Sequence, residues 1–172
     1  PATRRCWTSY SDDDGATWSA KSFNIPEPGT SFTTCGGGMG IYEASDGDLV
    51  AAGYGQDTAT APRYTSWEFR SSDAGVTWTV TATLAGTAGT AQYEEPNCGR
   101  LRGSSTHVCL IRVDNEPTSC TGAACGYVYV TRSTDDGATW STPTIAFNGR
   151  GTPPWRSEER RVGKECRSRW SP

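Results

Sequence analysis

The sequence predicts an all-β fold, a fragment of a β-propeller with about two to three four-stranded antiparallel blades. Three observations predict it: a turn motif that occurs three times, a near-constant spacing between its copies, and a composition with 20 Gly, 10 Pro and a single Met. Long runs of helix-forming residues are missing. Such a composition is typical of short strands joined by many turns.

The repeated motif reads S-x-D-x-G-x-T-W. Its serines are separated by 71 − 11 = 60 and 133 − 71 = 62 residues, so each interval can hold one structural unit. We expect a tight turn in which the Asp accepts backbone N–H groups, the Gly takes a positive φ and the Trp covers the hairpin. We interpret the motif as structural. Its residues are Ser11, Asp13, Gly15, Thr17, Trp18, Ser71, Asp73, Gly75, Thr77, Trp78, Ser133, Asp135, Gly137, Thr139 and Trp140.

Each interval between motifs divides into four short strand-like segments. Four antiparallel strands at a fixed period make a propeller blade. A further blade is expected to begin at residues 145–155. The strands expected in the two complete blades are Gly40–Ala44, Asp48–Tyr54, Ser66–Ser71 and Thr77–Ala82, then Gln92–Leu101, His107–Val113, Tyr127–Ser133 and Thr139–Thr142.

The end of the chain differs from the rest. Residues 156–172 are basic, show no strand alternation and match, over all 17 positions, one reading frame of a common short-read sequencing adapter. We therefore expect residues 1–155 to form the partial propeller and residues 156–172 to be a non-native tail. The alternative is a disordered basic tail that binds an acidic partner.

Without that tail the chain has 16 − 6 = 10 basic and 19 − 3 = 16 acidic residues, a net charge of −6. This charge disfavours nucleic acid as a partner, and no apolar run approaches the roughly 18 residues of a membrane span. Six cysteines remain, an even number that fits a secreted protein with disulfides. Spacing suggests that Cys120 pairs with Cys125. The alternative is free, buried thiols in a cytosolic protein.

We expect neither a cofactor nor a metal ion. His107 is the only His, which leaves no pair for a zinc motif. The acidic run before Gly15 does not fit an EF-hand, because Tyr10 and Lys21 would be the first and last ligands. The sequence also has no G-x-S-x-G nucleophile elbow.

The repeated motif resembles the Asp-box, or bacterial neuraminidase repeat, of the sialidase (neuraminidase) superfamily, and the resemblance covers most of residues 7–155. It implies a six-bladed propeller whose site contains three arginines, an acid/base Asp, a nucleophilic Tyr and a Glu that activates it. On this resemblance Glu95, or its neighbour Glu94, is the activating Glu, and Arg112, 17 residues after Glu95, is one of the arginines. Asp57, expected in a loop between a second and a third strand, is a substitute candidate for the acid/base Asp and, with Arg112, for contact with substrate. The other site residues are expected outside the fragment.

The resemblance therefore implies a fragment of a secreted exo-glycosidase that removes terminal sialic acid from glycoconjugates. Two alternatives stay open. One is a hydrolase of the same fold for a neutral sugar, such as an exo-arabinanase, since that group also carries Glu-Pro on a first strand, as in Glu95–Pro96. The other is a non-catalytic propeller that binds glycans or proteins. The fragment alone is expected to be inactive, because it carries at most the Glu and one Arg.

Overall fold

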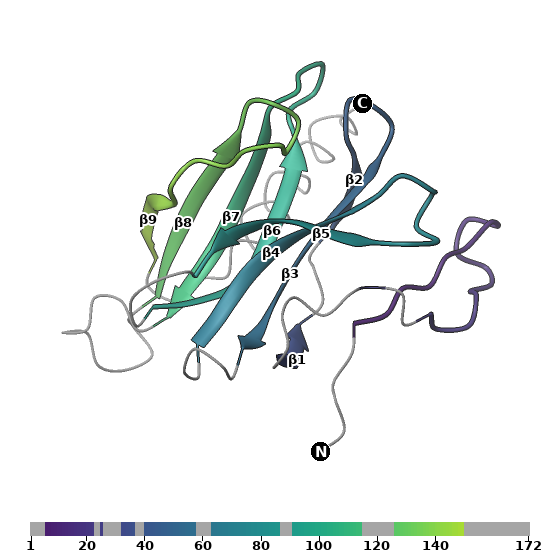
Figure 1. Cartoon of the computed structure of the whole chain (residues 1–172), viewed down its shortest axis with the longest axis horizontal. Coiled ribbons are helices and arrows are strands. Elements are labelled where there is room, and N and C mark those ends of the chain that lie inside the picture. Colours follow the sequence, from purple (N-terminus) through teal and green to yellow (C-terminus); the bar gives the residue numbers. More distant parts are fainter. Residues whose placement is uncertain are drawn as a thin grey trace, which may run out of the picture.

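The structure is a computed structural model of the chain, and it describes residues 6–22, 25, 32–36, 40–57, 63–86, 91–114 and 126–149. These residues form nine strands and no helix (Figure 1), so the described part contains no helix that could cross a membrane. The strands are β1 (Phe32–Gly36), β2 (Ile41–Glu43), β3 (Leu49–Asp57), β4 (Arg63–Ser71), β5 (Thr79–Ala85), β6 (Gln92–Arg100), β7 (His107–Asp114), β8 (Gly126–Ser133) and β9 (Thr144–Gly149).

The strands form two antiparallel sheets that correspond to two propeller blades. In the first blade β1 and β2 pair with opposite ends of β3, so together they fill one inner-strand position, and β4 and β5 follow. The second blade has the order β6-β7-β8-β9. Figure 1 shows β6 lying beside β3 and β4 of the first blade, in agreement with their contacts. The predicted all-β fold and the arrangement in blades are confirmed.

One expected strand is misplaced. Residues 139–142 were expected to form the fourth strand of the second blade and Ile145 to begin another blade, but the fourth strand is β9, which contains Ile145. In the first blade β5 begins directly after Trp78. In the second blade Pro143 follows the motif and has no N–H to donate to a ladder, so regular pairing begins one residue later.

The repeated motif forms the same turn three times, and in both complete blades this turn joins the third and fourth strands. In the second copy the Asp73 carboxylate accepts hydrogen bonds from the Thr77 N–H (2.8 Å), the Thr77 hydroxyl (2.6 Å) and the Ser71 hydroxyl (2.8 Å). The Ser71 oxygen in turn accepts the N–H of Gly75 (2.8 Å), whose φ is 88°. The first and third copies repeat these bonds. The bonds from the Thr lower the pKa of each Asp carboxylate to about 2.

The main hydrophobic core lies between the two blades. Side chains of β7 alternate strictly, and Cys109, Ile111 and Val113 are fully buried on the face toward the first blade. Cys109 and Ile111 pack in one cluster with Ala52 and Leu84 of the first blade, among others. Full burial of an aliphatic side chain such as Ile111 or Leu84 contributes about 1.5–3 kcal/mol, so this cluster holds the blades together.

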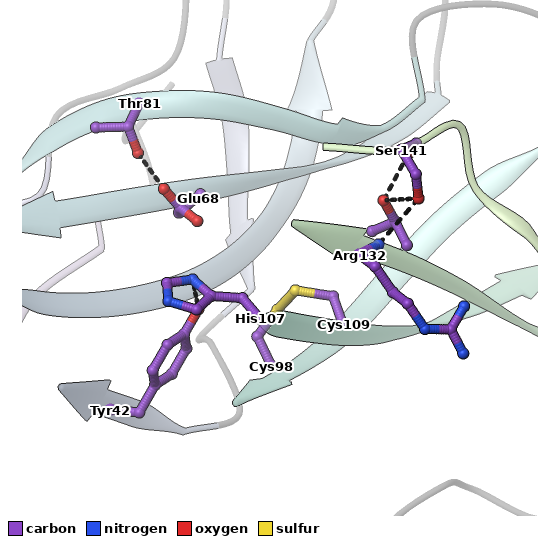
Figure 2. Close-up of a disulfide and its surroundings, with 9 residues drawn as sticks. Tyr42, Glu68, Thr81, Cys98, His107, Cys109, Arg132 and Ser141 are labelled. Carbon is purple, nitrogen blue, oxygen red and sulfur yellow. Dashed lines mark hydrogen bonds between the residues drawn. A yellow bond between two sulfur atoms is a disulfide. The ribbon is translucent and has the colours of Figure 1, made fainter. Parts of the chain in front are cut away.

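A disulfide crosses the second blade within this core (Figure 2). Cys98 of β6 and Cys109 of β7 are directly paired in the ladder, and their Cα atoms are 4.1 Å apart. This pair was not predicted from the sequence. The hairpin pairs Arg100 with His107, and this register places Cys98 opposite Cys109. The expected pair, Cys120 and Cys125, lies outside the described residues.

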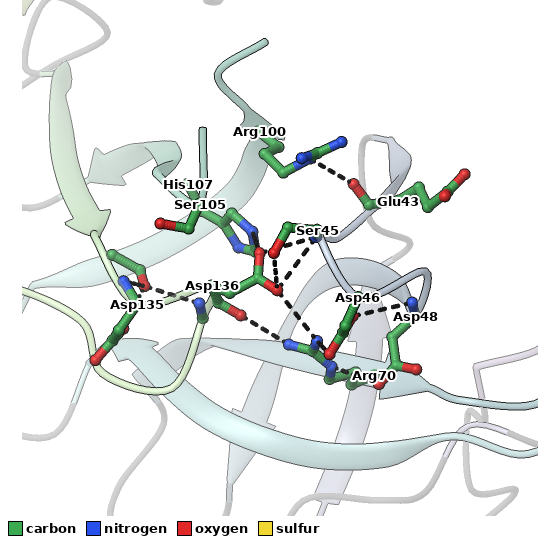
Figure 3. A network of polar contacts seen from close by, with 12 residues as sticks. Glu43, Ser45, Asp46, Asp48, Arg70, Arg100, Ser105, His107, Asp135 and Asp136 are labelled. Carbon is green, nitrogen blue, oxygen red and sulfur yellow. Dashed lines mark hydrogen bonds and ion pairs between the residues drawn. The ribbon is translucent and has the colours of Figure 1, made fainter. Parts of the chain in front are cut away.

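A polar joint connects the blades at the end that carries the motif turns (Figure 3). The Arg70 guanidinium bonds the carboxylates of Asp46 (2.5 Å) and Asp48 (2.8 Å) and the main-chain oxygen of Asp136 (2.7 Å). The Asp136 carboxylate lies 2.9 Å from Nε2 of His107, which is fully buried. On its other side the His107 ring lies 3.1 Å from the Tyr42 hydroxyl (Figure 2). Charged and aromatic groups of both blades thus fix their relative position.

Candidate active site

The candidate site lies at the opposite end of the second blade and begins with a bulge in β6. Glu94 pairs with Arg112 and Asn97 pairs with Leu110, so β6 has one residue more than β7 between these pairs. Within the bulge Glu95 has a φ of 49°, a left-handed conformation that is rare for a residue other than Gly. Strained backbone of this kind is concentrated at functional sites.

The bulge changes the direction of one side chain. Successive residues of a regular strand point to opposite faces of the sheet. Here Glu94 and Glu95 both reach Arg112 on β7, with N–O distances of 3.0 and 2.8 Å. The extra residue thus places two neighbouring carboxylates around one guanidinium.

Arg112 also bonds a third carboxylate, that of Asp114 at the end of β7 (2.5 Å). This bond, together with the charges around it, keeps the pKa of Arg112 above its ordinary value. Three carboxylates and one guanidinium leave the cluster with a net charge of −2 when all are ionised. Burial raises the pKa of Glu94, against the opposing charge of Arg112.

The first blade supplies an aromatic wall beside these carboxylates. Tyr54 of β3 and Tyr64 of β4 place their ring centroids 5.7 Å apart. Burial and then the charges of Glu95 and Glu94 raise the pKa of Tyr54. The strand that carries Tyr54, β3, packs against β6, the strand that carries both carboxylates. The Tyr64 N–H donates to the Gln92 side chain (3.0 Å), so the wall is attached to β6.

The sequence-derived candidates are partly brought together. Glu94, Glu95 and Arg112 are in direct contact, as described above. Asp57 is the last residue of β3, where its backbone pairs with Arg63. Sequence reasoning missed Asp114 and Tyr54. The signal for Asp114 was its position two residues after Arg112, on the same face of a strand, whereas Tyr54 required knowledge of how the blades pack.

This arrangement is suited to acid–base chemistry. Two carboxylates with different environments can divide the roles of acid and base or nucleophile, which is the common basis of glycoside hydrolysis. A guanidinium among them orients carboxylates and can bind an anionic group. Within the described ranges no group of His, Cys, Asp and Glu could hold a metal ion.

Several solved structures are similar to this chain in fold. A solved protein of unknown function from Dyadobacter fermentans is similar with a TM-score of 0.66 and 17% identity, over 82% of this chain and 38% of that one. A Hadza microbial sialidase has a TM-score of 0.58 and 25% identity, over 85% of this chain and 25% of the other. An α-L-arabinanase of Penicillium chrysogenum has a TM-score of 0.57 and 16% identity, over 87% and 43%.

This chain therefore spans less than half the length of each of these structures. No curated protein matches it significantly. A family model described as the BNR repeat-like domain matches residues 1–149, which is most of the chain. The chain belongs to the BNR repeat-like domain family.

Proposed function

We propose that the protein containing this chain is an exo-acting glycoside hydrolase, and that the bulge of β6 carries part of its active site. The observation that carries the proposal is the contact of both Glu94 and Glu95 with Arg112 at a strained strand position. The similarity to propeller glycosidases supports it. In this proposal Glu95 activates the nucleophile and Arg112 binds the substrate.

Terminal sialic acid is the first candidate substrate. Its carboxylate suits a guanidinium, and one of the similar structures is a sialidase. Because Arg112 already bonds three carboxylates, an anionic sugar would need further arginines from the rest of the propeller, or would have to displace Asp114.

A neutral sugar is the second candidate, and a specific observation favours it. The cluster around Arg112 carries two more negative than positive charges, which repels an acidic substrate and does not affect a neutral one. One similar structure is an arabinanase in complex with arabinobiose. Secretion is also part of the proposal, since a disulfide such as Cys98–Cys109 is typical of oxidising compartments.

The test is turnover by the complete protein of a fluorogenic sialoside and, in parallel, of an arabinoside. We expect Glu95→Gln to lower kcat by at least about 100-fold with little change in KM, because it removes activation of the nucleophile. Thr79→Ala is a control on the exposed surface of the first blade. Full activity of Glu95→Gln would exclude the catalytic assignment. Turnover of the arabinoside alone would select the neutral-sugar enzyme, and glycan binding without turnover would leave a binding module.

A further inference from the structure

The two blades place different residues at one equivalent position. Ser71 and Ser133 both begin a motif turn, and they pair with Leu49 and His107, the first residues of β3 and β7. The residue five positions further along is Tyr54 in β3 (49 + 5) and Arg112 in β7 (107 + 5). Tyr54 thus occupies in the first blade the position that Arg112 occupies in the second.

The inner strands follow the same correspondence. Arg112 pairs with Glu94 of β6, and Tyr54 pairs with Gly36 of β1. A Cβ atom at Gly36 would overlap the ring of Tyr54. The ring therefore lies over the backbone of β1, in space that only glycine leaves open.

The phenol of Tyr54 has the properties of a hydrogen-bond donor. Burial and the charges of Glu95 and Glu94 raise its pKa, so it remains protonated at neutral pH. Among the described residues no hydrogen bond to its hydroxyl is present, and its side chain is only partly buried. The ring of Tyr64 lies beside it, 5.7 Å between centroids, and extends the aromatic surface.

We propose that Tyr54 and Tyr64 form a sugar-binding subsite on the first blade, in which the Tyr54 phenol donates a hydrogen bond to a hydroxyl of the sugar positioned at Glu95. The apolar C–H face of a sugar ring packs on aromatic surface, and its hydroxyls need polar partners when they leave water. Tyr54 is a binding residue in this proposal and takes no part in bond cleavage. The proposal rests on the proposed glycosidase function.

The experiment uses the complete protein and the glycoside that it cleaves. We expect Tyr54→Phe to raise KM about 3- to 10-fold, the loss of one hydrogen bond, while kcat changes less than twofold. Gly36→Ala keeps the phenol but displaces the ring, and should raise KM at least as much. Tyr10→Phe is the matched control, because Tyr10 is 66% exposed in the first motif region and should leave both constants unchanged. Thermal unfolding of each variant verifies that it is folded.

The outcomes separate this subsite from the function. If the wild-type protein cleaves a glycoside and Tyr54→Phe has an unchanged KM, or loses kcat instead, the subsite is wrong and the hydrolase stands. If the wild-type protein binds a glycan without cleaving any, the hydrolase is wrong. In that case titration calorimetry tests the subsite. Weaker glycan binding by Tyr54→Phe than by the wild-type protein supports the subsite, and equal binding overturns it. If the wild-type protein neither binds nor cleaves any glycan, both the subsite and the hydrolase are wrong.

Discussion

The backbone N–H of Ser45 donates to both carboxylate oxygens of Asp136, at 3.0 and 3.2 Å, although 91 residues separate the two in sequence. The Ser45 hydroxyl donates to the same carboxylate at 2.8 Å. Asp136 belongs to the third motif turn and has a φ of 59°. The turn after β2 in the first blade is therefore fastened to a structural motif of the second.

Replacing Asp136 by Asn should loosen this joint without changing the turn, since Asn also accepts a left-handed backbone. We expect the free energy of unfolding of this chain at pH 7 to fall by about 1–3 kcal/mol, the contribution of hydrogen bonds to a charged group. Asp14→Asn is the matched control, because Asp14 has the same place and a φ of 55° in the first motif but makes no side-chain hydrogen bond within the described residues. Urea unfolding measures the difference, and equal losses in both variants would contradict the joint.

The same joint predicts a pH dependence. Burial alone would raise the pKa of Asp136, but the bonds from Ser45 and His107 lower it from 3.8 to about 2. A lowered pKa in the folded state stabilises the protein above pH 4, and this stabilisation is lost as the pH falls toward 2. The gap in stability between the wild-type chain and Asp136→Asn should therefore narrow between pH 4 and pH 2. A gap that stays constant over this range would show that the charge of Asp136 is not involved.

Two tryptophans of the repeated motif should differ strongly in importance. Trp78 is 5% exposed and packs with Trp67 and Phe69, whereas Trp18 is 66% exposed. Trp78→Ala should lower the free energy of unfolding of this chain by about 3–5 kcal/mol, and Trp18→Ala by less than about 1 kcal/mol. Denaturant titration of both variants tests this. Similar effects at the two positions would mean that the motif, rather than burial, decides the contribution.

The disulfide between Cys98 and Cys109 should be protected and stabilising. Both side chains are at most 9% exposed. Replacing both by Ala should lower the free energy of unfolding by about 2–4 kcal/mol, since the bond restricts the unfolded chain. In the folded, unreduced protein neither residue should react with iodoacetamide, as read by mass spectrometry of peptides. Alkylation of either one would contradict the pairing.

Glu95 combines a strained backbone with its proposed catalytic role, and Glu95→Gly should separate the two. Glycine adopts a φ near 49° without a steric penalty, which offsets the loss of a partly exposed ion pair with Arg112. We expect the thermal midpoint of the complete protein to change by no more than a few degrees while glycoside turnover is lost. Glu43→Gly, on β2 and away from Arg112, is a control for removing a strand Glu. A large drop in the midpoint would show that Glu95 is structural.

Much of the fold was predictable because the sequence patterns that indicate it involve residues close together in the chain. The turn motif defines the hairpins through bonds between residues two and four apart, as between Asp73 and Thr77, and the strand alternation around it is visible in β7. Glu94, Glu95 and Arg112 were selected through the resemblance to the sialidase superfamily, and their contact was seen only in the structure.

The details of the candidate site depend on backbone conformation and on packing between blades, which the sequence does not show. The left-handed conformation of Glu95 occurs at a residue that neither is Gly nor favours this region, directly before Pro96, which itself disfavours helical backbone at the preceding residue. The position of Tyr54 beside these carboxylates results from packing between blades. Neither could be derived from composition or periodicity.

The fastening of Ser45 by Asp136 also has a consequence for biosynthesis. A ribosome that adds roughly 5–20 residues per second needs on the order of 5–18 s to travel the 91 residues between them. During that time the turn after β2 lacks its acceptor, and Ala52 and Leu84 face water instead of β7. The first blade thus lacks these contacts until the second blade has been synthesised. Until then the nascent polypeptide is exposed to chaperones and proteases, and the sequence separation of Ser45 and Asp136 sets the length of this period.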